Sequence, residues 1–415
     1  MTVAPPRELI LPSGFVHKPD LAKLVTAAEL KTRPVYDWFY FPHSFSPTLV
    51  DRLVQHWRDD GRGPVQSLLD PFVGAGTTLL AARSLGLTAV GTDLSPLAVR
   101  VSEAKLGKYD EQRVNDDVER VVMTARADSR RYKTNDERLT RAFTPAEHAN
   151  LQRLRRAIHA HGDNGLLLLA FLNVLRETSR AYADGGWFRW VEKPDAWRSV
   201  FKEFRRTALR FVQEARHLQH LGTARQEVML SDARTLNEVQ GPFDAVLTSP
   251  PYPNRHDYTR VFHLELLLGA GLKNDDVLSL RHTSLRSHVE AKKPDVDADN
   301  YVEPEAATRL LEKIAAGGAD VRVERMLRGY LEDMYVALLR MHERLAAHGR
   351  VALVVSNVRH GGVMFPVDEL LVEVAARAGF EWEQTWVARY RGNSAQQMSV
   401  YGRDPARESV VLLRK

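Results

Sequence analysis

The fold of this chain is decided by the run Leu68-Leu69-Asp70-Pro71-Phe72-Val73-Gly74-Ala75-Gly76-Thr77-Thr78. It begins within a short apolar segment, residues 65–72, which predicts a buried strand. A helix is expected from about Thr77 to Leu85, directly after the glycines, and residues 88–93 predict a second strand. A strand, a glycine loop, a helix and another strand in this order predict an α/β fold with a doubly wound, parallel sheet.

The glycine loop points to a ligand. Gly74 and Gly76 allow close approach to the backbone, and the helix that follows offers free N–H groups. The Gly-x-Gly pattern alone is weak evidence of a ligand site, because many α/β proteins use it only to make a tight turn. The second strand ends in Asp93, 17 residues after Gly76, where an acid commonly binds ribose hydroxyls. Position 79 is leucine instead of a third glycine, and Asp70 would repel a pyrophosphate but suits an ammonium group. This favours S-adenosylmethionine over a dinucleotide.

The composition limits the chemistry. The chain has 415 residues, 44% hydrophobic and 27% charged, and no cysteine. Its length corresponds to two or three domains, or to one large domain with insertions. The lack of cysteine excludes disulfides, thiolate zinc sites and any cysteine nucleophile. Residues 1–15 lack a long apolar stretch and the apolar run 165–175 is too short to span a bilayer, so we expect a cytoplasmic protein.

Positive charge is concentrated in one segment. The formal net charge is +5, but residues 126–216 contain 19 basic and 11 acidic side chains. Such a segment is either the footprint of a polyanionic partner or a solvated helical face, and the charge alone favours neither.

Beyond residue 105 the strand–helix alternation is interrupted twice. Two more strands are expected at 227–231 and 243–248, then a helix at 329–347, a strand at 350–356, a helix at 366–378 and closing strands at 382–390 and 409–414. We therefore predict five parts: an N-terminal segment with the first part of the sheet domain at 1–105, a helical insertion and candidate DNA-recognition region at 106–226, a catalytic strand and loop at 227–270, a second insertion at 271–329, and the rest of the sheet domain at 330–415.

A tetrapeptide follows the buried strand at 243–248. It is Ser249-Pro250-Pro251-Tyr252. The two prolines fix the backbone and remove two donors, so their carbonyls can be held out as acceptors. In isolation this pattern is more often a strand stop, but open α/β sheets bind ligands at this end of their strands.

Both motifs resemble those of the DNA amino-methyltransferases. Residues 70–77 are similar to motif I of that family, and residues 249–252 are similar to motif IV. Serine in the first position of motif IV is typical of N4-cytosine enzymes, and aspartate or asparagine of N6-adenine enzymes. Phe45 and Ser46 resemble motif X, and Asp232-Ala233 resembles the acid that lies near the adenine. The resemblance covers residues 36–105, 227–265 and 330–415.

The resemblance implies a Rossmann-like sheet of seven strands, mostly parallel with the last antiparallel, and S-adenosylmethionine as cofactor. It implies transfer of a methyl group to N4 of a cytosine flipped out of double-stranded DNA, in a restriction–modification system with a cognate endonuclease. N6-adenine methylation is the near alternative; an RNA amino-methyltransferase and a catalytically silent DNA-binding protein are more distant ones. The cofactor residues it implies are Phe45, Ser46, Asp70, Phe72, Gly74, Ala75, Gly76, Thr77, Thr78, Asp93, Leu94, Asp232 and Ala233.

The tetrapeptide suggests how an exocyclic amine is activated. Such an amine is a poor nucleophile because its lone pair is delocalised into the ring. The Ser249 hydroxyl and the Pro250 carbonyl can accept its two hydrogens, which favours a tetrahedral nitrogen with a localised lone pair. We expect Tyr252 to stack on the extruded base. C5-cytosine methylation needs a cysteine, so that reaction is excluded.

Two loops supply candidate DNA contacts. Arg255 and Tyr258 follow the tetrapeptide, and Arg391 and Asn393 lie in a polar stretch after a strand. Each loop can equally be an ordinary surface loop. Residues 187–197 interleave tryptophans with basic residues, a composition that suits nucleic acid but is also common in cores. His263 and Glu265 lack a third ligand, and we predict no metal site.

Overall fold

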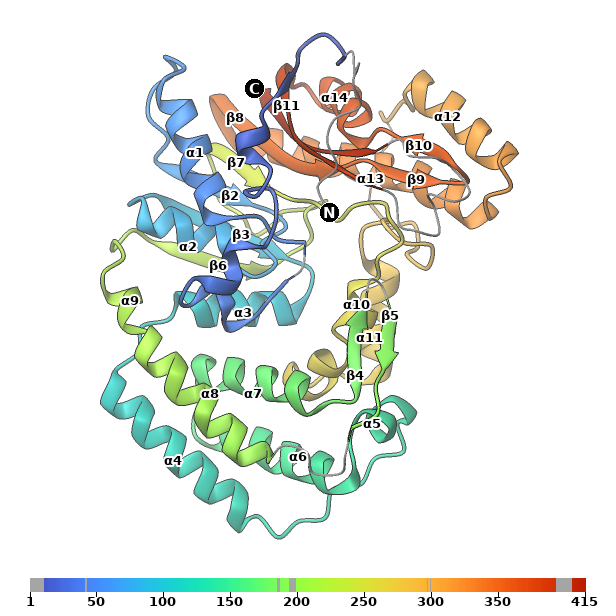
Figure 1. Cartoon of the computed structure of the whole chain (residues 1–415). Coiled ribbons are helices and arrows are strands. Elements are labelled where there is room, and N and C mark those ends of the chain that lie inside the picture. The colour runs from blue at the N-terminus through green and yellow to red at the C-terminus, as the bar shows by residue number, and fades with distance from the viewer. Residues whose placement is uncertain are drawn as a thin grey trace.

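The structure, a computed structural model, describes residues 11–41, 43–184, 187–193, 199–296, 298, 300–392 and 405–415. Its centre is an eight-stranded sheet of order β1-β11-β12-β8-β7-β2-β3-β6 (Figure 1). The strands are β1 (Phe15–His17), β2 (Ser67–Asp70), β3 (Thr88–Asp93), β6 (Gln226–Leu230), β7 (Phe243–Thr248), β8 (Leu345–Ser356), β11 (Glu381–Arg391) and β12 (Ala406–Arg414).

The sheet is mostly parallel. Strands β6, β3, β2, β7 and β8 run parallel to one another, and β12 is antiparallel to both β8 and β11. This confirms the predicted fold class with its antiparallel last strand. The expected count of seven strands was wrong, because β1 pairs in parallel with β11 at the edge. Three residues are too few for an alternating pattern to indicate a strand.

Helices cover both faces of the sheet. On one face, α1 (Pro47–Arg58) and α2 (Thr77–Ser84) share a core with the strand residues Ala245 and Leu247. On the other, α13 (Val321–Arg344) and α14 (Val367–Arg377) pack over Val246 and its neighbours. α3 (Pro96–Leu106) follows β3 and joins a third core.

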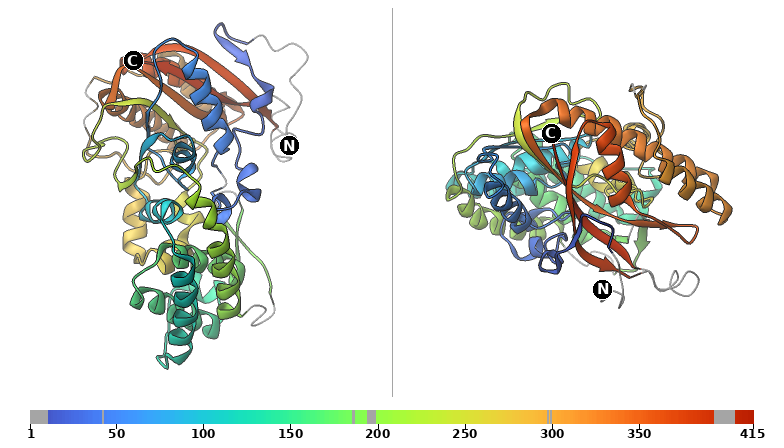
Figure 2. Two further views of the ribbon diagram at one scale, coloured as in Figure 1. Left: turned by 90° about the vertical axis from the view of Figure 1, so that its left-hand side faces the viewer. Right: turned by 90° about the horizontal axis from the view of Figure 1, so that it is seen from above.

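The first insertion forms a helical layer beside the sheet, seen below it in Figure 2, left. It comprises α4 (Glu111–Ala127), α5 (Glu137–Ala142), α6 (Pro145–Ala160), α7 (Gly165–Thr178), the hairpin β4 (Ala181–Asp184) and β5 (Trp187–Trp190), α8 (Val200–Glu214) and α9 (Arg216–Gln219). The apolar run 165–175 is α7, buried almost all round in this layer. Among the described residues, no helix is both long and apolar enough to cross a membrane.

The remaining elements are short, apart from two helices of the second insertion. They are α10 (Tyr258–Val261), the π-turn η4 (Glu265–Gly269), α11 (Asn274–Thr283), α12 (Glu305–Ala316), the hairpin β9 (Val358–His360) and β10 (Val363–Phe365), and the 3-10 turns η1 (Pro19–Leu21), η2 (Glu29–Thr32) and η3 (Tyr36–Trp38).

The helix expected at 329–347 is displaced towards the N-terminus. Asp320 caps α13 by accepting a hydrogen bond from the Arg322 amide, and the helix ends at Arg344. Residues 345–347 belong to β8 because Leu345 pairs with Phe243, so strand pairing overrides the helical propensity of the two alanines. The predicted boundary between residues 329 and 330 therefore falls inside α13.

Candidate active site

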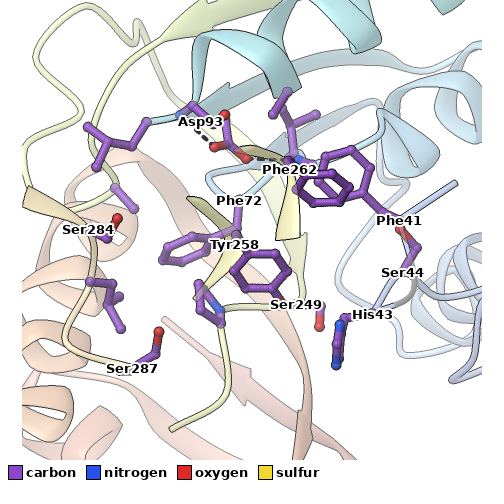
Figure 3. A pocket seen from close by; sticks show the side chains of 18 of the residues that line it. Phe41, His43, Ser44, Phe72, Asp93, Ser249, Tyr258, Phe262, Ser284 and Ser287 are labelled. Carbon is purple, nitrogen blue, oxygen red and sulfur yellow. Dashed lines mark hydrogen bonds between the residues drawn. The ribbon is translucent and has the colours of Figure 1, made fainter. Parts of the chain in front are cut away.

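A cavity lies at the carboxyl ends of the central strands. Asp70 and Asp93 are the last residues of β2 and β3, and Ser249 directly follows β7; all three line the cavity. Figure 3 shows Phe41, Ser44 and His43 on one side of it and Ser284 and Ser287 on the other. Motifs that are far apart in the sequence thus meet at the edge of the sheet where such folds bind ligands.

The two glycines of the loop have different roles. Both have positive φ angles, 51° at Gly74 and 77° at Gly76. Gly74 lines the cavity, and a Cβ built there meets no atom nearer than 3.9 Å. At Gly76 a Cβ would lie 3.0 Å from Ser102, so this glycine is required by packing. Gly74 is therefore the position where the backbone is open to a ligand.

Asp70 connects the two motifs. Its buried carboxylate accepts hydrogen bonds from the hydroxyls of Thr78 and Thr248, both at 2.6 Å, and from the Phe72 amide at 3.2 Å. Thr248 is the residue before Ser249, so one carboxylate ties the glycine loop to the tetrapeptide. Burial raises the pKa of Asp70 to about 6. Most of its acceptor capacity is used within the protein, and at most one lone pair remains for a ligand.

Asp93 fixes the glycine loop from the neighbouring strand. Its carboxylate accepts hydrogen bonds from the Gly74 amide at 3.0 Å and the Ser95 amide at 2.8 Å. Burial raises the pKa of Asp93 to about 6. Each oxygen keeps acceptor capacity, as binding a ribose diol requires.

Most of the predicted cofactor residues line the cavity. They are Phe45, Asp70, Phe72, Gly74, Thr77, Thr78, Asp93, Leu94, Asp232 and Ala233. Ser46, Ala75 and Gly76 are not among the lining residues. Ser46 caps α1 by accepting a hydrogen bond from the Thr48 amide. A wall of carboxylates, hydroxyls and apolar side chains fits an adenosine that carries an amino-acid tail.

Ser249 and Tyr252 contact each other. The Ser249 hydroxyl donates to the Val354 carbonyl at 3.0 Å and lies 3.2 Å from the Tyr252 hydroxyl. Tyr252 is only 7% exposed, and burial raises its pKa to about 12. Ser249 and Pro251 line the cavity, whereas Pro250 and Tyr252 do not. The ring predicted to stack on a base is covered in this structure.

Other rings also form walls of the cavity, and apart from Tyr258 the sequence did not indicate them. Phe41 and Phe262 lie with ring centroids 4.6 Å apart, and Tyr258 stacks against Phe262 at 6.5 Å. His43 also lines the cavity and lies 4.4 Å from the buried ring of His256. Burial lowers the pKa of His43 to about 4. Phe41 was visible in the sequence only as part of an aromatic cluster at 36–41, and Phe262 carried no signal.

The second insertion supplies another wall of the cavity. Its lining residues are Leu280, Ser284, Leu285, Ser287 and His288. A buried ion-pair network holds this wall: Arg234 pairs with Asp232 at 2.7 Å and with Asp333 at 3.1 Å, and donates to the Thr283 carbonyl at 2.5 Å. Arg286 also pairs with Asp333, at 2.5 Å. Nothing in the sequence of this segment indicated such a role.

The predicted DNA contacts lie in different settings. Arg255 is exposed, with φ at 69°, and its amide donates to the Ser287 carbonyl at 3.1 Å. Tyr258 lines the cavity, and Arg391 pairs with Glu408 at 3.2 Å. Asn393 lies outside the described residues, as does Trp197 of the aromatic and basic segment.

The side chains considered as metal ligands have other partners. His263 lies 3.1 Å from the Arg138 guanidinium, and Glu265 pairs with Arg176 at 2.6 Å.

Acids neutralise much of the basic segment 126–216. Arg205 pairs with Glu119, Arg210 with Asp37 and Arg216 with Glu111, each at 2.6–2.7 Å. These pairs lie on a largely exposed helical surface. The arrangement favours a solvated, ion-paired face over a continuous polyanion footprint for this part of the segment.

The fold and the cavity define an α/β methyltransferase with an adenosine-type cofactor site. Residues 19–104 match the family model described as DNA methylase. The chain is 28% identical to the type II methyltransferase M.AvaI of Nostoc sp., over 96% of this chain and 90% of the relative. It is 25% identical to the type II methyltransferase M.BsoBI of Geobacillus stearothermophilus, over 95% and 88%. The rRNA methyltransferase aviRa of Streptomyces viridochromogenes shares 12% identity over 94% and 92% of the chains, with a TM-score of 0.32.

The chain is thus related to the DNA amino-methyltransferases, as the two motifs predicted. The lining of the cavity fits S-adenosylmethionine, the cofactor expected from the glycine loop.

Proposed function

We propose that this protein is a sequence-specific type II DNA methyltransferase that methylates N4 of cytosine as part of a restriction–modification system. The observation that carries the proposal is the position of Ser249, which lines the same cavity as Gly74 and Asp93. The names of its relatives support DNA as substrate, because M.AvaI and M.BsoBI are type II methyltransferases and match nearly the whole chain. Serine at the head of the tetrapeptide supports cytosine over adenine.

The cofactor site follows from the donors and acceptors present. Asp93 would hold the ribose hydroxyls, and the free N–H groups at the start of α2, which no side chain caps, would hold the carboxylate of the tail. Phe72, Leu94 and Ala233 would enclose the adenine. When bound, S-adenosylmethionine supplies an electrophilic methyl group on a sulfonium. No other chemistry is asked of the cofactor, and the protein's task is to orient and activate the amine.

Ser249 is prepared to accept a hydrogen bond. Its single hydroxyl hydrogen goes to the Val354 carbonyl at 3.0 Å. The contact with Tyr252 at 3.2 Å must therefore be a hydrogen bond in which Tyr252 donates. One lone pair of the Ser249 oxygen remains to accept an N–H of the substrate amine. Tyr252 thus acts by orienting Ser249 in this structure, in addition to any stacking.

The second amine hydrogen needs another acceptor. Among the described residues, none donates a hydrogen bond to the Pro250 carbonyl. Its acceptor capacity is therefore unused within the described part of the protein. Two acceptors on adjacent residues, held by two prolines, would favour a tetrahedral nitrogen with a localised lone pair. A neutral hydroxyl is sufficient for this, because it needs only to accept.

The extruded base needs an apolar slot beside Ser249. Tyr258 and Phe262 line the cavity and stack on each other, and His43 lies nearby with its ring neutral at physiological pH. We assign the walls of the base site to these rings. Base–aromatic stacking is worth roughly 1–3 kcal/mol per base, which offsets part of the cost of unstacking.

The decisive experiment is methylation of plasmid DNA with tritiated S-adenosylmethionine, followed by mass spectrometry of the nucleosides. We expect N4-methylcytosine. The Ser249→Ala variant loses one preorganised hydrogen bond, and its turnover should fall on the order of a hundredfold with cofactor affinity unchanged. Ser84→Ala is the matched control, since that hydroxyl bonds the Leu80 carbonyl within α2.

Three results would contradict parts of the proposal. N6-methyladenine as the only product would reject the base assignment and leave the methyltransferase function intact. Full turnover by Ser249→Ala would reject the mechanism. No label in any duplex DNA would reject DNA methylation itself.

A further inference from the structure

The hairpin of β4 and β5 has two different faces. Side chains alternate along its strands, and the register pairs Ala181 with Trp190 and Tyr182 with Arg189. Ala181 and Trp190 pack on the core of the helical layer, and Arg141 of α5 covers the Trp190 ring at 4.3 Å. Tyr182 and Arg189 therefore point away from that core.

The described side chains of the outward face, Tyr182 and Arg189, are exposed and form a preformed pair. Tyr182 is 59% exposed, the largest exposure that a described aromatic side chain shows. Arg189 is also exposed, and its guanidinium lies 5.4 Å from the centre of the Tyr182 ring. Such a cation–π contact restricts the guanidinium before any ligand binds. The pair offers an aromatic face and guanidinium donors together, a combination that suits nucleic acid.

The hairpin adjoins the candidate active site. β5 packs against α10, and α10 begins with Tyr258, which lines the cavity (Figure 1). It is one of several elements of the first insertion that contact the chain after the tetrapeptide, since α6 and α7 pack against η4. The hairpin therefore lies beside the part of the chain that supplies a wall of the cavity.

The charge at the base of the hairpin also favours DNA. A hollow there is lined by Arg141, Arg180 and Lys193, with Glu192 as its acid. Arg180 pairs with Glu147 at 2.6 Å, while the Lys193 ammonium donates to the Ser179 carbonyl at 2.6 Å. Three cations against Glu192 and Glu147 leave the hollow with a positive charge that is suited to a phosphate.

We propose that the side chains of Tyr182 and Arg189 enter the major groove of the duplex beside the target base, and that Arg189 reads a base pair there. The inference rests on the proposed function, because it names the element that gives that site its sequence preference. The major groove, about 12 Å wide, admits a two-stranded ribbon, and arginine to guanine is the commonest specific contact. Tyr182 would hold the guanidinium in place.

The first test measures site preference. Methylation by the full-length Arg189→Gln variant is profiled over a pool of duplexes with randomised positions around the methylated base. We expect roughly a tenfold to hundredfold loss of kcat/KM on the preferred site, with relaxed preference at one base pair and unchanged affinity for S-adenosylhomocysteine. Arg216→Gln on α9 is the matched control, an exposed arginine paired with Glu111. Unchanged preference, or an equal loss on all sequences, would overturn the inference.

The second test does not depend on methyl transfer. A benzophenone amino acid is placed at position 182, and at Met123 of α4 as a control that is 70% exposed. Irradiation with a radiolabelled duplex should crosslink the position-182 protein to a base near the target and leave the control uncrosslinked. Crosslinking no stronger than at position 123 would overturn the inference even if wild-type methylates DNA. Crosslinking without methylation by wild-type would instead reject the proposed function.

Discussion

The two insertions of this chain relate to the cavity in opposite ways. None of the described residues of the first insertion lines the cavity, whereas five residues of the second do. The first leaves the sheet domain after α3 and returns at the start of β6, that is, at the amino ends of the strands. The second leaves after β7 and its loop, at the carboxyl ends, where α/β sheets bind ligands. Whether an insertion lines the cavity is thus decided by the connection of the sheet that it interrupts. The length and helical content of the insertion matter less.

Two sets of ion pairs, one at each insertion, also differ in burial. The second insertion is held by Arg234 and Asp333, which lie outside it in the sequence and whose side chains are 2% and 1% exposed. Arg234 donates to the Thr283 carbonyl of the insertion, and Asp333 of α13 pairs with its Arg286. On the first insertion, the side chains of Arg205 and Arg206 are more than half exposed and pair with acids. Removing one member of a buried pair leaves an uncompensated charge, whereas an exposed pair is replaced by water.

The largest effect should come from the buried network. Arg234→Met leaves Asp232 without its partner and removes one cation from Asp333, so the free energy of unfolding should fall by about 3–5 kcal/mol. Arg206→Met removes an exposed pair with Glu203 and should change it by no more than about 1 kcal/mol. Denaturant unfolding of the full chain measures both. Equal losses would show that the second insertion is held no differently from the first.

A matched pair of leucines separates stability from binding. Leu285 lines the cavity at 6% exposure, and Leu169 is buried in α7 at 0%. Either change to alanine should lower the free energy of unfolding by about 2–5 kcal/mol. Only Leu285→Ala should also weaken binding of S-adenosylhomocysteine, by roughly tenfold, since removing apolar surface from a ligand site costs on the order of 1.5 kcal/mol. Calorimetry at a temperature where both variants are folded tests this, and equal affinities would contradict the wall assignment.

The sequence predicted the local parts of this arrangement well. β3 and β7 span the predicted residues, and α2 begins at the predicted residue Thr77, because strand patterning and a glycine loop are encoded within a few neighbours. The same holds for the meeting of Gly74 with Ser249, which follows from strand topology.

The features that the sequence did not predict depend on contacts between segments that are far apart in the chain. The cavity wall at residues 280–288 is held by the pairing of Arg286 with Asp333, 47 positions away. No local sequence pattern predicts this pairing. Burial of Tyr252 arises in the same way, from packing against α13 and its surroundings. Tertiary packing thus decides the role of an aromatic ring such as Tyr252, even where its motif is evident from the sequence.

The pH dependence of cofactor binding tests the two carboxylates of the cavity, Asp70 and Asp93, which belong to neither insertion. Burial raises the pKa values of Asp70 and Asp93 to about 6. The ionised forms accept the ligand's hydrogens, so affinity for S-adenosylhomocysteine should be full above about pH 7 and fall as pH drops through 6, by up to about tenfold per unit for each required carboxylate. His43 and His256 have pKa values lowered by burial to about 4 and 3, so they stay neutral over this range. A flat profile between pH 5 and 8 would show that neither acid must be ionised.

The smallest expected effect is on the salt dependence of DNA binding, and it distinguishes two parts of the first insertion. Arg141 and Lys193 lie at the base of the hairpin, whereas Arg205 and Arg206 lie on α8, where Glu119 and Glu203 already pair with them. If the hairpin side binds phosphates, Arg141→Gln with Lys193→Gln should reduce the slope of log affinity for duplex DNA against log salt by about one for each phosphate that is no longer neutralised. Arg205→Gln with Arg206→Gln should leave that slope unchanged, because the acids would otherwise have to give up their partners before a phosphate could bind. Fluorescence anisotropy over a salt series compares the two double variants with the wild-type protein. An equal fall of the slope in both double variants would mean that the whole basic segment contacts the DNA. The two parts of the insertion would then not differ in DNA binding.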